Sequence, residues 1–279
     1  MRGKSFNWGD RTYIMGVLNV TPDSFSDGGQ FNTLETAVAR ARSLVEEGAD
    51  ILDIGGQSTR PGAEQVPLEE ELNRVLPVVR ALREPQNRDI LSVPISVDTT
   101  RSQVAIAAVE AGADLINDVS GGVRDADMLG AVASLEVPVV LMHSRGTPET
   151  MQKLTDYDDL IAEIYRFLGD RIEAAIAAGV DRKNIIIDPG IGFAKTLGHN
   201  LEILRRLGEF RHLGVPILVG ASRKSFIGHI LNRPNPQERV WGTAAASCAA
   251  IAAGADIIRV HDIPEMRDVC RVADAIYRV

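Results

Sequence analysis

Residues 13–29 read YIMGVLNVTPDSFSDGG, a run of apolar residues followed by a polar loop that ends in two glycines. The run over 13–19 has the length and composition of a buried strand. The loop after it is not the G-x-G-x-x-G turn that usually follows the first strand of a dinucleotide-binding open sheet. It is also longer than a connection to the next helix requires. The stretch therefore favours a closed barrel over an open sheet, and it raises the question of what this loop does.

The alternation of short apolar runs and longer amphipathic stretches repeats along the whole chain. Many of the amphipathic stretches end in a glycine suited to a left-handed helix cap: Gly48, Gly112, Gly179 and Gly254. Helices are expected between the runs, for example over 33–49, where apolar residues recur every three or four positions. We expect eight strands, within 13–19, 50–56, 93–99, 114–121, 137–143, 184–190, 215–222 and 256–262. Strands that alternate with helices are parallel, so the pattern predicts an α/β fold, a (β/α)8 TIM barrel with eight helices.

No linker or shift in composition divides the 279 residues, and we expect a single domain over 1–279. The segment before the first strand, SFNWGDRTY at 5–13, reads as a small strand and turn. We expect it to form an N-terminal hairpin that closes the bottom of the barrel.

The composition excludes several classes of function. Thirty basic and thirty-eight acidic residues give a net charge of −8, and the basic residues form no run of the kind that binds nucleic acid. No stretch is apolar for the length of a membrane span, and the first ten residues lack the apolar core of a signal peptide. The two cysteines, Cys248 and Cys270, do not have the spacing of metal ligands. We expect a cytoplasmic protein that acts on small molecules and not on nucleic acid or membranes.

Polar residues lie at the carboxyl end of every predicted strand, where barrels of this kind have their active sites. A single Asp or Asn there more often caps the following helix. Polar residues at all eight ends are harder to explain by capping, and they indicate a site formed by Asn19, Asp53, Asp98, Asn117, Asp118, His143, Asp188, Arg223, Lys224, Ser225, Arg259 and His261.

One group among these residues is basic. Arg259 and His261 are two positions apart on one strand, so their side chains share a face, and Lys224 follows the neighbouring strand. Phosphate often binds at the last two loops of such barrels, and three donors there predict an anionic ligand, a phosphate ester or pyrophosphate. The alternative is a surface salt bridge to Asp256 or Asp262. The apolar residues on either side of Arg259 favour the ligand.

A second group consists of Asp98, Asn117 and Asp188, whose neighbours are apolar. Buried carboxylates need partners, and Lys224 is the one cation expected nearby. A heterocycle with an amino-substituted edge would offer each carboxylate two parallel hydrogen bonds, and an Asn side chain can both donate to and accept from a ring. The sequence thus predicts an amino-substituted heterocycle that carries phosphate, and both nucleobases and pterins fit.

A second polar loop, DIGGQSTRPGAEQV at 53–66, follows the second strand and contains Arg60, Pro61 and Gly62. A solvated loop with a chance arginine would be an ordinary explanation. However, the first two loops adjoin, and both are longer than a connection requires. A pair of lids that close over a substrate and exclude water would explain both.

Seven stretches resemble the dihydropteroate synthase family and follow its order: LNVTPDSFSDGG, LDIGGQSTRPGAEQV, SVDT, INDVSG, DPGIGF, SRKSFIG and RVHD. They cover essentially the whole chain. The resemblance implies a pterin-binding barrel, a transferase that joins 6-hydroxymethyl-7,8-dihydropterin diphosphate to 4-aminobenzoate. The products would be 7,8-dihydropteroate and pyrophosphate, in folate biosynthesis. It also implies Mg2+, inhibition by sulfonamides and a homodimer.

The resemblance assigns a role to particular residues. The pterin diphosphate would be bound by Asp98, Asn117, Asp188 and Lys224 at the ring and by Thr59, Arg259 and His261 at the diphosphate. Asn19 would be a Mg2+ ligand, and Lys224, Arg259 and His261 would be the catalytic groups. The 4-aminobenzoate pocket and the lid loops would contain Phe25, Asp27, Arg60, Pro61 and Ser225. Gln57 stands where many bacterial members have Glu, which puts a carboxylate role at that position in doubt.

Two other functions remain open. A pterin-dependent methyltransferase would share the barrel and the pterin pocket, but it would not need the basic corner of Arg259 and His261 or the STRPG of the second loop. A non-catalytic pterin-binding barrel would not need two lids. The helix expected over 242–255, rich in small residues, could pack against a second subunit or be internal core.

Overall fold

The computed structural model describes residues 1, 4–21, 30–87, 90 and 92–278, with the side chains of 30–33 left out. The first loop, 22–29, lies outside these ranges, and with it Phe25 and Asp27. The described strands are β1 (Tyr13–Asn19), β2 (Ile51–Gly55), β3 (Ile95–Asp98), β4 (Leu115–Asp118), β5 (Val139–Met142), β6 (Ile185–Asp188), β7 (Leu218–Val219) and β8 (Ile257–Val260). Each lies within its predicted range.

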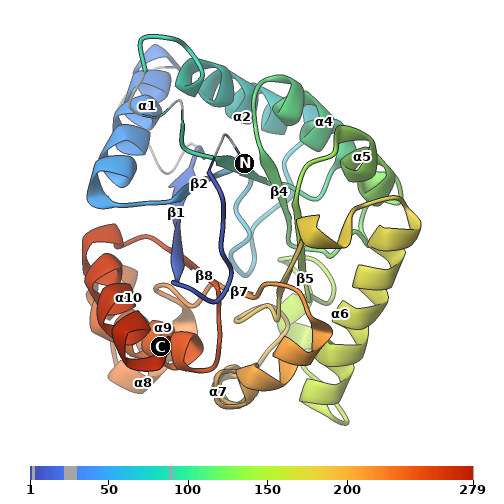
Figure 1. The fold of residues 1–279 in the computed structure, drawn as a ribbon, viewed down its shortest axis with the longest axis vertical. Helices are drawn as coiled ribbons and strands as arrows, with labels where there is room; N and C mark the ends of the chain where they lie inside the picture. The colour runs from blue at the N-terminus through green and yellow to red at the C-terminus, as the bar shows by residue number, and fades with distance from the viewer. Residues whose placement is uncertain (2–3, 22–29, 88–89, 91, 279) are drawn as a thin grey trace.

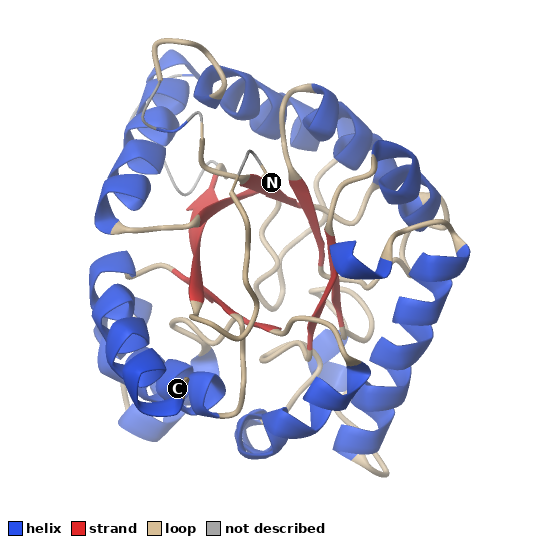
Figure 2. Ribbon diagram, viewed as in Figure 1, coloured by secondary structure: helices blue, strands red, loops and turns tan. Residues whose placement is uncertain are grey.

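The eight strands are parallel and form one sheet in the order β6-β5-β4-β3-β2-β1-β8-β7. The two ends of this order meet, because Ile187 of β6 forms a parallel bridge with Ile217, the residue before β7. The amide of Ile187 also donates to the carbonyl of Pro216 at 2.9 Å. Figure 2 shows the resulting inner ring of strands inside an outer ring of helices. The predicted TIM barrel is confirmed.

The helices surround the barrel (Figure 1). The α-helices of the described chain are α1 (Gln30–Glu47), α2 (Leu68–Leu82), α4 (Ser102–Glu110), α5 (Met128–Leu135), α6 (Leu160–Ala177), α7 (Leu197–Arg206), α8 (Ser225–Leu231), α9 (Val240–Ala252) and α10 (Ile263–Tyr277). Short 3-10 helices are η2 (Met151–Lys153), η3 (Arg182–Asn184), η4 (Leu207–Leu213) and η5 (Pro236–Arg239). Within the described ranges, no helix has both the length and the apolar content that crossing a membrane would take.

The connection from β7 to β8 contains two α-helices, α8 and α9, where one was predicted. The helical pattern is interrupted at Asn232, which adopts a left-handed conformation with φ of 53°. Pro234 follows and cannot continue a helix. The predicted glycine caps are confirmed, since Gly48, Gly112, Gly179 and Gly254 have φ of 116°, 115°, 102° and 98°.

Side chains alternate between the two faces of each strand, which divides the core into two parts. Outward-facing residues such as Leu52, Ile116 and Ile258 pack against the helices. Inward-facing residues fill the lower barrel with an apolar layer of Tyr13, Met15, Ile51, Leu115, Val140, Ile186, Leu218 and Ile257. Because the period is two, the next inward position along each strand lies one layer higher, toward the carboxyl ends.

The segment before β1 does not form the predicted hairpin. Residues 4–12 contain a turn at 8–10 and no strand. The turn is held by side chains instead, since the amide of Asn7 donates to the Tyr13 hydroxyl at 2.8 Å and that of Gly9 to Asp256 Oδ1 at 3.1 Å. The rings of Phe6, Trp8 and Tyr13 pack with centroids 4.7–5.4 Å apart and contact the apolar layer. The segment thus closes the bottom of the barrel as expected, but as an aromatic cap.

Candidate active site

A polar layer lies directly above the apolar layer inside the barrel. It consists of Asp53, Asp98, Asn117, Asp188 and Arg259, one from each of β2, β3, β4, β6 and β8. Four of them follow an inward apolar residue by two positions, as Asp53 follows Ile51. The four acidic and amide side chains are no more than 6% exposed. The sequence therefore brings these strand ends together inside the barrel mouth, and not in separate helix caps.

Arg259 connects the predicted basic group, to which it belongs, with the predicted group of Asp98, Asn117 and Asp188. Its Nε donates to Asp53 Oδ2 at 2.6 Å and its Nη2 to Asp98 Oδ2 at 3.1 Å. Asn117 Nδ2 also donates to Asp53 Oδ2, at 3.1 Å. The prediction that Lys224 is the one cation near the carboxylates is therefore wrong. Arg259 and Asp53 both face the interior of the barrel, from the strands on either side of β1, and the sequence does not indicate that they meet.

The surface salt bridge considered for Arg259 does not form. Asp262 pairs with Arg223 instead, and Asp256 accepts from the backbone amides of Gly9 and Ile217. Arg259 therefore faces the interior of the barrel, as its apolar neighbours indicated.

Burial is the largest single influence on the pKa of Asp98, Asp188 and Arg259 in the polar layer. Desolvation raises the pKa of Asp98 to about 7, although the positive charge of Arg259 opposes the shift. Desolvation also raises the pKa of Asp188, and a hydrogen bond from the amide of Gly190 opposes it. Burial alone would lower the pKa of Arg259, but the carboxylates of Asp53 and Asp98 raise it overall. The layer thus combines the fixed positive charge of Arg259 with the raised pKa values of Asp98 and Asp188. Shifted pKa values of this kind are typical of functional sites.

Lys224 lies beside this layer, as predicted. Its Nζ donates to the carbonyl of Ile191 and lies 4.3 Å from the centroid of the Phe193 ring. Burial lowers its pKa to about 8, and the nearby charge of Asp188 counteracts that effect. A β-carbon at Gly192 would lie 2.7 Å from Lys224 Cδ, so the lysine needs the glycine beside it. The structure therefore brings Lys224 and Asp188 to the same site.

His261 lies just beyond β8. Its Nδ1 is 3.0 Å from the hydroxyl oxygen of Ser222, whose Oγ also accepts from the His261 amide at 3.2 Å. Burial, followed by the charges of Arg259 and Arg223, lowers the pKa of His261 to about 3. The imidazole is therefore neutral near pH 7, and it can offer an anion a hydrogen bond but not a charge.

Asn19 ends β1 next to the polar layer. Asn19 is paired with Gly55, and Gly55 with Asp98, in the strand register. A β-carbon at Gly55 would lie 3.5 Å from Asn19 Oδ1 and 3.7 Å from Asp98 Cβ. The glycine thus leaves room for the Asn19 amide to approach the layer. Among the described residues no cluster of three or more His, Cys, Asp or Glu could hold a metal ion.

The second loop is more exposed than the polar layer. Thr59 is half-buried, whereas Arg60 and Pro61 are exposed. The loop is tied to the segment after β5 by a hydrogen bond from the amide of Gly62 to the carbonyl of Pro148, at 2.9 Å. The charge of Arg60 contributes to the low pKa of His261, which places the loop within electrostatic reach of β8.

Ser225 is exposed at the first position of α8, next to Lys224, so it lies at the rim of the site. Its carbonyl accepts from His229 Nδ1 at 2.7 Å.

Three residues near the site were not assigned a role from the sequence. Asp53 and His143 were noted only as polar strand ends, and Lys195 was missed altogether. Lys195 is 3% exposed, and its Nζ is 3.0 Å from His143 Nδ1. The available signal was a lysine in an otherwise apolar, glycine-rich stretch, DPGIGFAK at 188–195.

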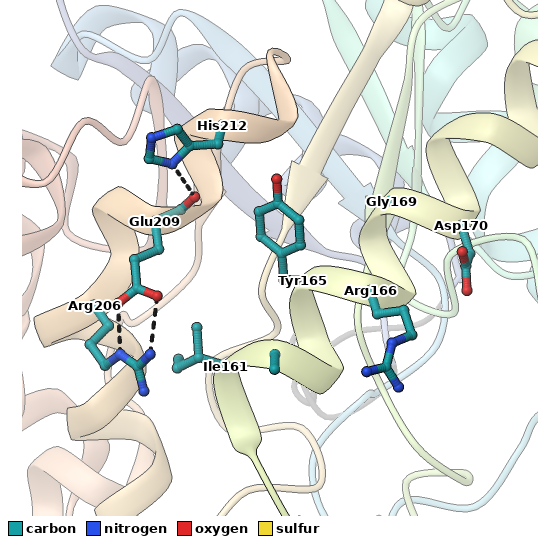
Figure 3. A pocket seen from close by; sticks show the side chains of 9 residues that line it. Ile161, Tyr165, Arg166, Gly169, Asp170, Arg206, Glu209 and His212 are labelled. Carbon is teal, nitrogen blue, oxygen red and sulfur yellow. Dashed lines mark hydrogen bonds and ion pairs between the residues drawn. The ribbon is translucent and has the colours of Figure 1, made fainter.

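A separate hollow of about 650 Å³ lies on the outside of the barrel, between α6 and η4 (Figure 3). Three of its polar residues are paired with one another. Arg206 Nε donates to Glu209 Oε1 at 2.7 Å, and His212 Nδ1 lies 2.9 Å from the Glu209 carbonyl oxygen. None of the strand-end residues lines it. The mouth of the barrel is therefore the better candidate for the active site.

Comparisons with known proteins agree with this placement. The family model of pterin binding enzymes matches residues 15–261. The dihydropteroate synthase of Synechocystis sp. is 56% identical over 98% of this chain and 93% of its own length. A solved structure of Xanthomonas albilineans dihydropteroate synthase with 4-aminobenzoic acid has 49% identity and a TM-score of 0.89, covering 97% of this chain and 95% of that one.

Another structure of the Xanthomonas albilineans enzyme, in complex with 7,8-dihydropteroate, has 46% identity and a TM-score of 0.86. It covers 98% of this chain and 96% of that one. The predicted resemblance is confirmed, and the chain belongs to the dihydropteroate synthase family of pterin-binding enzymes.

Proposed function

We propose that this chain condenses 6-hydroxymethyl-7,8-dihydropterin diphosphate with 4-aminobenzoate and releases 7,8-dihydropteroate and pyrophosphate. The observation that carries the proposal is the polar layer, which sets buried carboxylates and an amide beside Lys224 and Arg259 in one barrel mouth. Relatives in complex with 4-aminobenzoic acid and 7,8-dihydropteroate support both the substrate and the product.

The pterin ring is bound by Asp98, Asn117, Asp188 and Lys224. Asp188 and Asp98 are acceptors for N–H groups, and Asn117 can donate and accept with one side chain. The Asn117 amide already donates to Asp53, which restricts its orientation and leaves its oxygen to accept from the ring. Lys224 donates to the ring carbonyl and a ring nitrogen.

The diphosphate is bound by Thr59, Arg259 and His261. Loss of pyrophosphate leaves a cationic methylene group on the pterin, so the site must stabilise a departing anion and a developing cation at once. Arg259 supplies the positive charge for the anion, and neutral His261 supplies a hydrogen bond. Asp98 and Asp188 stabilise the cation. The amine nitrogen of 4-aminobenzoate then forms the new C–N bond and loses its proton, and no protein nucleophile is needed.

Mg2+ would fit this site as an ion carried by the diphosphate. Mg2+ usually keeps several waters and takes one or two protein ligands together with substrate phosphates. The single amide oxygen of Asn19 beside the polar layer suits that mode. When bound, the ion would supply charge that neutralises the leaving pyrophosphate.

The 4-aminobenzoate pocket is formed by the lid loops. Pro61 provides an apolar surface, while Arg60 and Ser225 lie at the rim. Phe25 and Asp27 belong to the same proposal, as the apolar wall and as a group that orders the closed loops. Closure of the lids would keep water from the reactive cation. Sulfonamides, which mimic the amine, would compete in the same pocket.

A pyrophosphate-release assay tests the function directly. The protein is mixed with pterin diphosphate and Mg2+, with and without 4-aminobenzoate. Release that depends on 4-aminobenzoate is the expected result. A pterin-binding protein that releases none under either condition would fit the non-catalytic alternative, and methyl transfer from a methylated pterin would fit the methyltransferase.

A homodimer is proposed from the exposed side of α8, α9 and α10, which lie side by side (Figure 1). Large apolar side chains are exposed there: Ile230, Leu231, Trp241, Val272, Ile276 and Tyr277, from 43% to 75%. A contiguous patch of exposed apolar side chains usually marks an interaction surface, and these helices could bring the six side chains together. We also propose that the protein is cytoplasmic and that residues 1–279 form a single domain.

A further inference from the structure

A buried pair of basic side chains, Lys195 and His143, has no part in the function proposed above. Both are at most 3% exposed. Burial and the charge of Lys195 lower the pKa of His143 to about 2, so the ring is neutral and its Nδ1 can accept from Lys195 Nζ. Burial also lowers the pKa of Lys195 well below its usual value, and its amino group can donate in either protonation state. Lys195 Nζ also donates to the carbonyl of Phe193 at 2.9 Å. A buried lysine is costly unless it is well paired, so its presence requires an explanation.

The segment that contains Lys195 holds two of the pterin-binding groups. This segment, residues 189–196 between β6 and α7, is called here the 189–196 loop. The amide of Gly190 donates to Asp188 Oδ1 at 2.7 Å. On the other side, the Ile191 carbonyl accepts from Lys224, and the Phe193 ring lies under the same ammonium group. The shape of the 189–196 loop therefore determines where Asp188 and Lys224 are presented.

The backbone of the 189–196 loop is tightly constrained. Gly190 has φ of 74°, and a β-carbon there would lie 2.0 Å from the His143 carbonyl oxygen. Ala194 has φ of 51°, a left-handed conformation that an alanine adopts only under constraint. Its carbonyl accepts from the Tyr157 hydroxyl at 3.0 Å. Contacts with neighbouring elements must therefore hold this backbone in place. The Tyr157 hydroxyl provides one of them, and the buried Lys195–His143 pair provides another.

We propose that Lys195 is a positioning residue for pterin recognition, and that with His143 it fixes the 189–196 loop in the shape that presents Asp188 and Lys224 to the ring. The inference rests on the proposed function, because the ligand is the pterin. The effect should be confined to the binding of the pterin ring. The diphosphate-binding residues Arg259 and His261 lie at the end of β8, outside the 189–196 loop.

The test compares Lys195→Met with Lys183→Met, a matched control on the outer surface, where the side chain is 78% exposed. Calorimetry gives the affinity for an unphosphorylated pterin, and steady-state assays give the KM for each substrate and inhibition by pyrophosphate. We expect Lys195→Met to weaken pterin binding and raise the KM for pterin diphosphate by about 10- to 100-fold, as small misplacements of binding groups do. Pyrophosphate inhibition and the KM for the amine substrate at saturating pterin diphosphate should not change.

Two further measurements separate the possible outcomes. Lys195→Gln keeps a hydrogen-bond donor at this position, so it should recover part of the pterin affinity. If Lys195→Met does not fold, the same measurements are made on Lys195→Gln. Unchanged pterin affinity, or equal weakening of pterin and pyrophosphate, would overturn the positioning role. A wild-type protein that neither binds pterin nor releases pyrophosphate would overturn the proposed function instead.

Discussion

The polar layer and the loop residues above it differ in how far their side chains are fixed by the protein itself. Asp53 on β2 accepts hydrogen bonds from both Asn117 on β4 and Arg259 on β8. Arg60 and Pro61, in contrast, lie on an exposed loop held by backbone contacts such as that of Gly62. The part of the site that binds pterin diphosphate, called here the pterin end, is thus preorganised. The 4-aminobenzoate pocket, called here the amine end, is completed only when substrates bind. Substitutions in the two regions should therefore differ in size and in what they affect.

Removal of Arg259 should have the largest effect, because it would leave the carboxylates of Asp53 and Asp98 without their cation. Loss of one partner from a buried ion pair costs about 3–5 kcal/mol, so Arg259→Met should lower the free energy of unfolding by that amount. Urea denaturation followed by circular dichroism measures it. Arg205→Met, exposed on α7, is the control and should be nearly neutral. Equal stability of both variants would mean that the polar layer is not held by Arg259.

Asp188→Asn should be next in size and should affect binding more than folding. The change replaces one acceptor oxygen by a donor, so one hydrogen bond to the amino edge is lost and one donor faces another. Each unpaired polar group in a buried site costs about 1–3 kcal/mol. Calorimetry with an unphosphorylated pterin measures the loss. Asp181→Asn on the exposed η3 cap is the control. Pterin affinity that survives in Asp188→Asn would place the ring elsewhere.

His261→Ala should separate the two ends of the first substrate. A hydrogen bond to a charged group contributes about 1.5–3 kcal/mol, so binding of the pterin diphosphate should weaken by about 10- to 100-fold. Unphosphorylated pterin should bind as in the wild type. His212→Ala is the matched control, since this exposed histidine lies in the outer hollow of Figure 3. Equal weakening of both pterins by His261→Ala would contradict the assignment, and an effect of His212→Ala would point to the outer hollow.

The pH dependence follows from the raised pKa of Asp98, about 7, and the lowered pKa of Lys224, about 8. Asp98 can accept hydrogen bonds with both oxygens and stabilise the developing cation only when ionised, so kcat/KM for pterin diphosphate should fall as the pH drops below 7. Lys224 loses its charge above 8, so the rate should fall again, by about tenfold per pH unit on each limb. The profile should therefore be a bell with its maximum between these values.

Two variants assign the limbs of this profile. Asp98→Asn should remove the acidic limb and leave the alkaline one, and Lys224→Met should do the reverse. An acidic limb that persists in Asp98→Asn would belong to the substrate or to another group, such as Asp188, whose pKa is also raised by burial.

The sequence predicted the barrel because its evidence is local. Strand and helix periods are visible in single stretches, and the glycine caps at Gly48 and Gly254 mark helix ends within one turn. The strand ends Asp98, Asn117 and Asp188 could be placed together by the same reasoning, since carboxyl ends of barrel strands meet at one mouth. Their chemistry predicted that they bind an amino-substituted heterocycle, and the resemblance alone chose the pterin among the candidates.

What the sequence did not predict depends on contacts between distant residues. The contact of Arg259 with Asp53 joins positions 206 residues apart, and no pattern in either strand indicates it. Lys195 stands in a loop, where periodicity says nothing about burial. The expected hairpin at 5–13 failed for a similar reason, because side chains from Tyr13 and Asp256 satisfy the backbone that a second strand would have paired.

Arg60→Ala should have the smallest effect and should change only the second substrate. The guanidinium is exposed, and an interaction of an exposed charge contributes about 0.2–1 kcal/mol, or roughly a fivefold change at most. We therefore expect the KM for the amine substrate to rise by a few-fold at saturating pterin diphosphate. The affinity for pterin diphosphate without the amine should stay that of the wild type, because Arg60 is not among the residues assigned to that substrate. Raising the salt concentration should reduce the difference between variant and wild type.

Arg101→Ala serves as the contrasting control for this last prediction. Arg101 is largely buried, and it donates to Glu71 Oε2 and to the Val66 carbonyl, so it ties the end of the second loop to α2. Its loss should lower stability and affect both substrates. If Arg60→Ala instead weakened pterin diphosphate as strongly as it weakened 4-aminobenzoate, the second loop would belong to the preorganised part of the site. The division between a fixed pterin end and an amine end completed by substrates would then be wrong.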